Sequence, residues 1–139
     1  MKLTDYQSYA DAQAHFSKQA LWDLFDGDRD QLNLTHECLD RHRGKGRAVR
    51  IAYADGRDTS YTFEELSRWA SRFANYLQHM GIEKGDRVAI LLEPSLPFYV
   101  ALFGTMKMGA VAVPMFTLFG KDALAMRLDD CMPRLLVAT

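Results

Sequence analysis

The sequence predicts an α/β protein in which a helical lead-in and a β-hairpin precede a parallel β-α-β-α-β unit. Short apolar runs at 87–92, 110–113 and 135–138 are typical of buried strands, and helical segments lie between them. Crossover helices between buried strands make the strands parallel, with right-handed connections. Hydrophobic residues make up 48% of the 139-residue chain, so it can build a core. The pattern is that of a folded globular protein.

The lead-in carries apolar residues at steps of three and four between Tyr6 and Phe25, which predicts one or two amphipathic helices. Thr35 then precedes a short helical segment that contains Cys38 and Leu39 and ends at the basic loop 43–47. We divide the chain accordingly. Residues 1–47 form a helical N-terminal lead-in, and residues 48–139 form the hairpin with the first parallel α/β portion.

A hairpin is predicted where Val49, Ile51 and Tyr53 alternate with other residues, Asp55-Gly56 forms a turn, and extended character resumes at 59–63. The first long helix starts immediately afterwards. Thr62 and Glu65 have the spacing of a capping box, and Gly81 stands where a left-handed C-cap is needed, so the helix should run to Met80.

Further caps define the rest of the unit. Ser95 can cap a second helix that tolerates Pro97 in its first turn and closes at Gly109. A loop at 116–120 and a third helix at 122–129 follow. Ligands of open α/β sheets gather at the carboxyl ends of the strands, which here are segments 93–95 and 114–119.

Composition excludes several partners. Seventeen Lys and Arg against eighteen Asp and Glu leave a formal charge of −1, which gives no basic field for nucleic acid or an anionic membrane. The N-terminus lacks the pattern of a signal or transit peptide and no apolar run could cross a membrane, so we expect a cytoplasmic protein. Cys38 and Cys131 fit no metal-ligand spacing and are expected to be reduced and buried.

The residues themselves predict no catalytic residue and no metal site. Gly44-Lys45-Gly46 lacks the earlier glycine and the following Ser or Thr of a phosphate loop, and no strand-to-helix junction carries G-x-G-x-x-G. His36 and His42 are spaced too widely for a one-turn pair of metal ligands. Helix capping explains Ser95 better than nucleophilic catalysis, because it lies between prolines rather than in G-x-S-x-G.

Six blocks, taken in order, resemble the adenylate-forming (AMP-binding) superfamily. They are Ser60-Tyr61-Thr62-Phe63-Glu64-Glu65-Leu66, Arg72 to Leu77, Met80 to Ile90, Pro94 to Phe98, Gly104 to Pro114, and Ala123 to Cys131. The resemblance covers roughly residues 32–139, and within the superfamily segment 33–42 is most similar to acyl-CoA synthetases of the acetate, medium-chain or aromatic-acid type. It therefore implies that the α/β unit belongs to the large N-terminal domain of that fold.

Such enzymes join a carboxylic acid to ATP with Mg²⁺, forming an acyl-adenylate and pyrophosphate, and CoA then displaces AMP. The family's phosphate loop, its Mg²⁺ residues and its mobile C-terminal lysine do not occur in this chain. The chain ends on an apolar, strand-like run, so we expect an N-terminal fragment that is inactive alone and binds ATP, Mg²⁺ and CoA without high affinity.

One family role falls within the chain. In acetyl-CoA synthetases an F-G-G-F loop after the second strand helps to receive the nucleotide end of CoA, and Phe116-Thr117-Leu118-Phe119 stands at the matching place. The resemblance thus implies that Phe116 contacts CoA. Thr117 and Leu118 replace the glycine pair, however, and an equally good interpretation is that Phe116 and Phe119 only pack the loop onto the sheet.

Two other functions remain open. The chain fits a standalone α/β binding or assembly module without catalysis, and its parent fits an adenylating enzyme that loads a carrier protein instead of CoA. The sequence specifies neither the acid nor the oligomeric state. An exposed sheet edge predicts self-association of the fragment.

Overall fold

The structure, a computed structural model, describes residues 1–139, and the chain forms two compact units, 1–33 and 34–139. The first unit holds a 3-10 helix, η1 (Leu3–Asp5), and two short helices, α1 (Tyr9–Ala14) and α2 (Lys18–Trp22). Ser8 and Ser17 cap the two α-helices by accepting hydrogen bonds from backbone N–H groups three residues on. The expectation of one or two helices in this segment is confirmed.

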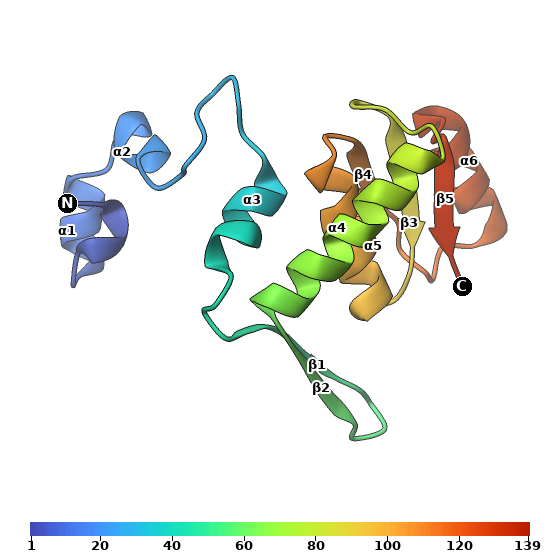
Figure 1. Ribbon diagram of the computed structural model, residues 1–139, viewed down its shortest axis with the longest axis horizontal. Helices are drawn as coiled ribbons and strands as arrows, with labels where there is room; N and C mark the ends of the chain where they lie inside the picture. The colour runs from blue at the N-terminus through green and yellow to red at the C-terminus, as the bar shows by residue number, and fades with distance from the viewer. The chain divides into compact units, whose positions relative to one another are not determined.

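The second unit contains the remaining elements (Figure 1). In chain order they are α3 (Leu34–Cys38), η2 (Asp40–His42), β1 (Arg47–Ala52), β2 (Asp58–Thr62), α4 (Phe63–His79), β3 (Arg87–Leu91), α5 (Leu96–Lys107), β4 (Val111–Pro114), α6 (Lys121–Cys131) and β5 (Leu135–Ala138). Strands β1 and β2 pair antiparallel as the predicted hairpin, which projects away from the rest of this unit (Figure 1).

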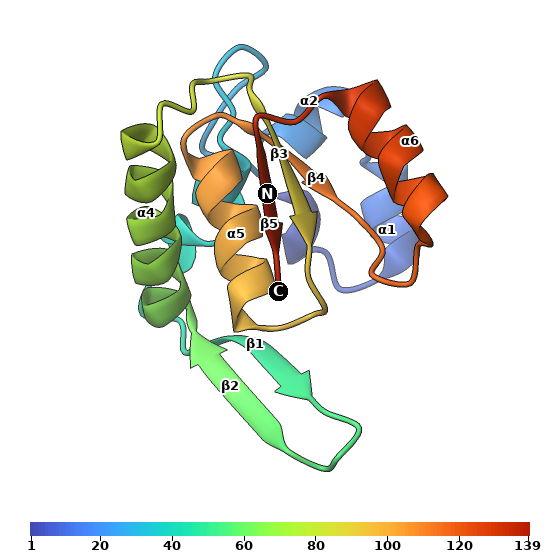
Figure 2. The same ribbon diagram turned by 90° about the vertical axis from the view of Figure 1, so that its right-hand side faces the viewer.

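The predicted β-α-β-α-β unit is confirmed as a parallel sheet with strand order β4-β3-β5. Helices α4 and α5 lie on one side of this sheet and α6 lies on the other (Figure 2). Val88, Ala89 and Ile90 of the central strand are fully buried, as expected for a strand covered on both faces. The main core, between the sheet and helices α4 and α5, consists of Leu77, Ile82, Val88, Ile90, Leu92, Ala101 and Ala110.

Both predicted ends of α4 are present. Thr62 ends β2 and is also the N-cap of α4: its hydroxyl accepts from the N–H of Glu65 at 3.2 Å, while its own N–H donates to the Glu65 carboxylate at 2.9 Å. At the other end Gly81 has φ +77°, and the N–H of Ile82 donates to the carbonyl of Leu77 at 3.0 Å. The N–H of Gly81 donates to the carbonyl of Gln78 at 3.1 Å, and the two bonds together form a Schellman cap.

Helices α4 and α5 approach closely at Gly104. A Cβ atom placed there would lie 2.8 Å from the carbonyl oxygen of Ala70 and 2.8 Å from a ring carbon of Phe73. The absence of a side chain at Gly104 is therefore what lets the two helices pack face to face.

At the start of α5, Ser95 accepts a hydrogen bond from the N–H of Phe98 at 3.4 Å, which confirms its capping role.

Two expectations about burial are wrong. Strands β4 and β5 each pair only with β3, so both are edge strands, and Val111 and Leu136 are 47% and 43% exposed. A short apolar run has the same appearance in an edge strand as in a central one. Cys38 is exposed and Cys131 half-buried, although both are free thiols as expected.

No helix combines the length and the apolar character that crossing a membrane requires.

Candidate functional site

The carboxyl ends of β3 and β4 meet at one edge of the sheet, because Ile90 stands opposite Pro114 in the parallel register. The segments that leave these strands enclose an open groove of about 370 Å³. Its lining residues are Leu92, Glu93, Pro94, Phe98, Pro114, Met115, Phe116 and Thr117. The groove thus lies where an open α/β sheet ordinarily binds its ligand.

The loop that follows β4 is tied to the sheet at both strands. Met115 is buried, and its N–H donates to the carbonyl of Ile90 at 2.8 Å. The hydroxyl of Thr117 donates to the carboxylate of Glu93, just beyond the end of β3. The N–H of Phe119 donates to the carbonyl of Phe116 at 3.1 Å, which closes a turn. Loop 115–120 is consequently held in a defined shape.

The loop displays one aromatic ring and packs another. Phe116 is 58% exposed, whereas Phe119 is half-buried, and the two rings contact each other edge to face with centroids 5.6 Å apart. Arg127, on α6, places its guanidinium carbon 3.9 Å from the centroid of Phe119. An exposed ring beside an apolar groove can stack on a flat ligand group, such as a nucleotide base.

The structure brings the predicted residue Phe116 to this edge, but whether it contacts CoA is still a prediction. Two residues at the edge were given no role from the sequence. Glu93 could have been noticed because it follows a strand directly at the carboxyl edge, where its carboxylate can reach a neighbouring loop. Arg127 gave no signal, because its contact with Phe119 depends on how α6 folds back toward the loop.

Ser95 follows Pro94 at this edge and caps α5, whereas the glycine segment and the two histidines considered from the sequence do not line the groove. Gly44-Lys45-Gly46 lies between η2 and β1, not between a strand and a helix. His36 is exposed, while His42 packs against Phe63 with ring centroids 5.3 Å apart. The chain contains no cluster of three or more His, Cys, Asp or Glu side chains that could hold a metal ion.

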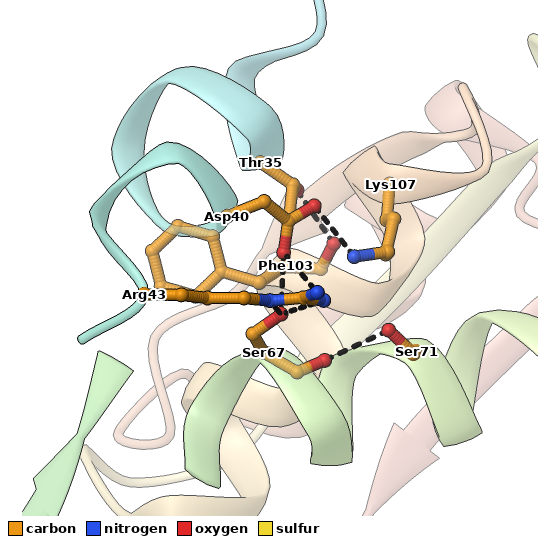
Figure 3. Close-up of polar contacts among 7 residues, drawn as sticks. All are labelled: Thr35, Asp40, Arg43, Ser67, Ser71, Phe103 and Lys107. Carbon is orange, nitrogen blue, oxygen red and sulfur yellow. Dashed lines mark hydrogen bonds and ion pairs between the residues drawn. The ribbon is translucent and has the colours of Figure 1, made fainter. Parts of the chain in front are cut away.

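A polar cluster of Asp40, Arg43, Ser67 and Lys107 joins η2 to helices α4 and α5 (Figure 3). Lys107 donates to one oxygen of Asp40 at 2.6 Å, and the Ser67 hydroxyl donates to the other at 2.5 Å. Arg43 donates in turn to that hydroxyl at 2.8 Å. Nearby, the Thr35 hydroxyl donates to the carbonyl of Phe103 at 2.7 Å. Ser67 is fully buried, so this cluster fastens the elements together rather than presenting a nucleophile to a substrate.

The cluster also sets the ionisation of Asp40. Burial acts to raise the pKa of this carboxyl, but hydrogen bonds from Lys107 and Ser67, with the charges of Lys107 and Arg43, together outweigh it. The pKa of Asp40 is therefore held below its ordinary value, and the carboxylate is charged at neutral pH.

Acid should remove what this carboxylate contributes to stability. Because the pKa of Asp40 is lower in the folded chain, the unfolded chain takes up its proton first as the pH falls. The contribution is complete above the unfolded pKa of about 3.9 and is lost as the pH falls through the folded pKa. In urea unfolding at several pH values, the difference in free energy of unfolding between the unsubstituted chain and Asp40→Asn should be constant above about pH 5 and shrink below about pH 4. A difference that grows on acidification would contradict this assignment. Asp58→Asn, on the exposed hairpin, is the control and should show a smaller difference throughout.

Comparison with known proteins defines the class. A sequence model of the family described as AMP-binding enzyme matches residues 40–139. The chain belongs to this AMP-binding enzyme family, which confirms the resemblance seen in the sequence.

The relatives that it matches are longer proteins, and acyl-CoA synthetases are among them. Acetyl-coenzyme A synthetase of Bacillus subtilis is 36% identical over 138 residues, covering 96% of this chain and 24% of that protein. The crystal structure of an acyl-CoA synthetase from Brucella canis superposes with a TM-score of 0.86 at 33% identity, covering 94% of this chain and 24% of that one. ATP-bound MatB from Rhodopseudomonas palustris has a TM-score of 0.62 at 28% identity over 75% of this chain and 20% of its own. This chain thus spans about a fifth to a quarter of the length of these relatives.

Proposed function

We propose that the chain is the N-terminal part of an AMP-forming acyl-CoA synthetase, which converts a carboxylic acid, ATP and CoA to acyl-CoA, AMP and pyrophosphate. The observation that carries the proposal is the similarity, over almost the whole chain, to acetyl-CoA synthetases in sequence and to an acyl-CoA synthetase in structure. The structural relative crystallised with ATP supports the nucleotide. In the first step a carboxylate oxygen attacks the α-phosphorus of ATP and pyrophosphate leaves. In the second step the CoA sulfur attacks the acyl carbon and AMP leaves.

This chain supplies a binding edge rather than the reacting groups. Phe116 presents its ring for stacking on the nucleotide end of CoA, and the contact between Thr117 and Glu93 holds the loop against the neighbouring strand. Mg²⁺ belongs to the proposed reaction, but no cluster of ligating side chains in this chain fits it, so we assign it no residue here. Charge neutralisation at the phosphates falls to parts of the family fold that this chain does not contain.

The direct test assays a protein that carries this segment followed by the remaining family blocks. With acetate, medium-chain and aromatic acids supplied in turn, we expect acid-dependent pyrophosphate release and formation of a CoA thioester. The 139-residue chain alone should release no pyrophosphate, and acid-dependent release by it would overturn the proposal. Transfer of the acyl group only to a pantetheinylated carrier protein would identify the carrier-loading alternative. Absence of adenylation by the longer protein would favour the binding module.

Replacement of Phe116 by alanine should weaken CoA binding selectively. Base stacking on an aromatic ring contributes on the order of 1 kcal/mol, so the KM for CoA should rise about fivefold. Exchange of pyrophosphate into ATP, which needs no CoA, should keep its rate. Leu118→Ala is the matched control, because Leu118 lies in the same loop and is 78% exposed. An unchanged KM for CoA in Phe116→Ala would refute the contact.

We also propose that the isolated chain self-associates. Strand β4 and strand β5 are both edges, and they expose Val111 and Leu136 by 47% and 43%. Unpaired strand edges with apolar side chains favour pairing with a second copy. Light scattering should show an average mass that rises with concentration, and Val111→Lys should reduce the rise. A monomer at all concentrations would count against this proposal.

A further inference from the structure

We propose that Arg127 is a positioning residue that holds Phe119, and through Phe119 the ring of Phe116, in the orientation that receives CoA. The inference rests on the proposed function and adds to it a residue on α6 that does not line the groove. It starts from the contact between Arg127 and Phe119, with 3.9 Å from guanidinium carbon to ring centroid.

This contact is closer than the chain's other arginine–ring contacts, which measure 5.9, 4.7 and 5.2 Å and involve Trp22, Tyr53 and Trp69. Trp22 belongs to the first unit, while Tyr53 follows β1 and Trp69 lies on α4, and neither of these two lines the groove. Within the second unit the contact of Arg127 is therefore the one at the carboxyl edge of the sheet, and it is short enough for the planar guanidinium to lie against the ring.

Arg127 is itself fixed on its helix. One of its terminal nitrogens donates to the carbonyl of Ala123, one turn earlier, at 2.9 Å. The side chain is also half-buried, which limits its rotamers. The guanidinium is thus held in one position, and the ring of Phe119 packs against it.

Phe119 passes this constraint to Phe116 in two ways. The edge-to-face contact between the rings has an interplanar angle of 79°, and the backbone bond from Phe119 to Phe116 closes the turn between them. Thr117 is held from the other side by Glu93. The loop is thus held at two points, by Glu93 just after β3 and by Arg127 on α6, and the exposed ring of Phe116 lies beside them. Loss of the α6 anchor would leave the Phe116 ring free to turn.

The test uses the longer enzyme and compares Arg127→Gln with Arg127→Lys. Glutamine can still donate to the Ala123 carbonyl but removes the cation from the ring, so the KM for CoA should rise about threefold. Lysine keeps the charge and should restore part of the loss. The rate of CoA-independent pyrophosphate exchange should stay unchanged in both, which also shows that the variants fold. Met126→Gln places the same new side chain on an exposed neighbouring position of α6 and should have no effect.

A double-mutant cycle separates positioning from direct binding. If Arg127 acts through the rings, combining Arg127→Gln with Phe116→Ala should raise the KM for CoA no further than Phe116→Ala alone. Additive increases would overturn the inference, as would an unchanged KM in Arg127→Gln. If Phe116→Ala has no effect while Arg127→Gln does, the proposed ring contact fails and Arg127 is not a positioning residue. If Phe116→Ala acts and Arg127→Gln does not, the proposed contact stands and only this inference fails.

Discussion

Replacing Gly104 by valine should lower the free energy of unfolding by about 3 kcal/mol, the upper range for overpacking a well-packed core. A side chain at this position would begin 2.8 Å from the carbonyl oxygen of Ala70, which is backbone and cannot rotate away. Helices α4 and α5 would have to separate, and the core between them and the sheet would lose contacts. Urea unfolding, followed by circular dichroism, measures the loss.

A graded series makes the cause specific. Gly104→Ala should still destabilise the chain, although alanine by itself favours a helix by about 1 kcal/mol over glycine. The loss should be smaller than with valine, because alanine adds the smaller side chain. Gly120→Ala is the control, because φ at Gly120 is −67° and a Cβ there meets no atom within 4 Å. If Gly104→Val unfolds at the same urea concentration as the unsubstituted chain, the close approach of the helices is wrong.

Replacing Asp40 by leucine should lower the free energy of unfolding by about 2 kcal/mol. Breaking a fully buried ion pair by deleting one partner costs about 3–5 kcal/mol. The side chains of Asp40 and Lys107 retain 18% and 22% exposure, so water partly compensates. Asp40→Leu leaves Lys107 and Arg43 facing each other as like charges, and Ser67 loses the acceptor for its hydroxyl. Urea unfolding at pH 7 gives the change in free energy.

The pair can be isolated by a double-mutant cycle. Asp40→Leu combined with Lys107→Met should be less destabilising than the sum of the two single changes, because no uncompensated member of that pair remains. The exposed ion pair of Arg50 with Asp58 provides the comparison, and its removal should cost less than about 1 kcal/mol. Strict additivity at Asp40 and Lys107 would show that the two groups do not depend on each other.

The sequence predicted what depends on neighbours along the chain. The caps of α4 come from Thr62, Glu65 and Gly81, which act within one turn of the helix ends. The parallel sheet followed from the helices between apolar runs. Strand order did not, because local patterns carry no information on which strand is central, and hence Val111 was expected to be buried.

Contacts between distant residues could not be predicted in the same way. Asp40 and Lys107 lie 67 positions apart and meet only because η2 packs beside the end of α5. At the candidate site the sequence identified the loop and Phe116, while the anchors of that loop required the folded arrangement of β3 and α6. The division of the chain at residues 47 and 48 concerns the domains of the whole protein and stays a prediction.

The double role of Thr62 limits how the length of this protein can vary. The same residue closes the hairpin and opens α4, so there is no spacer between the two elements. An insertion at this junction would separate the hydroxyl from the helix that it caps and would turn the following side chains of α4 away from the core. An insertion at the exposed turn 54–57 changes neither the cap nor the helix face. Length variation among homologous sequences should therefore collect at the tip of the hairpin and avoid its base.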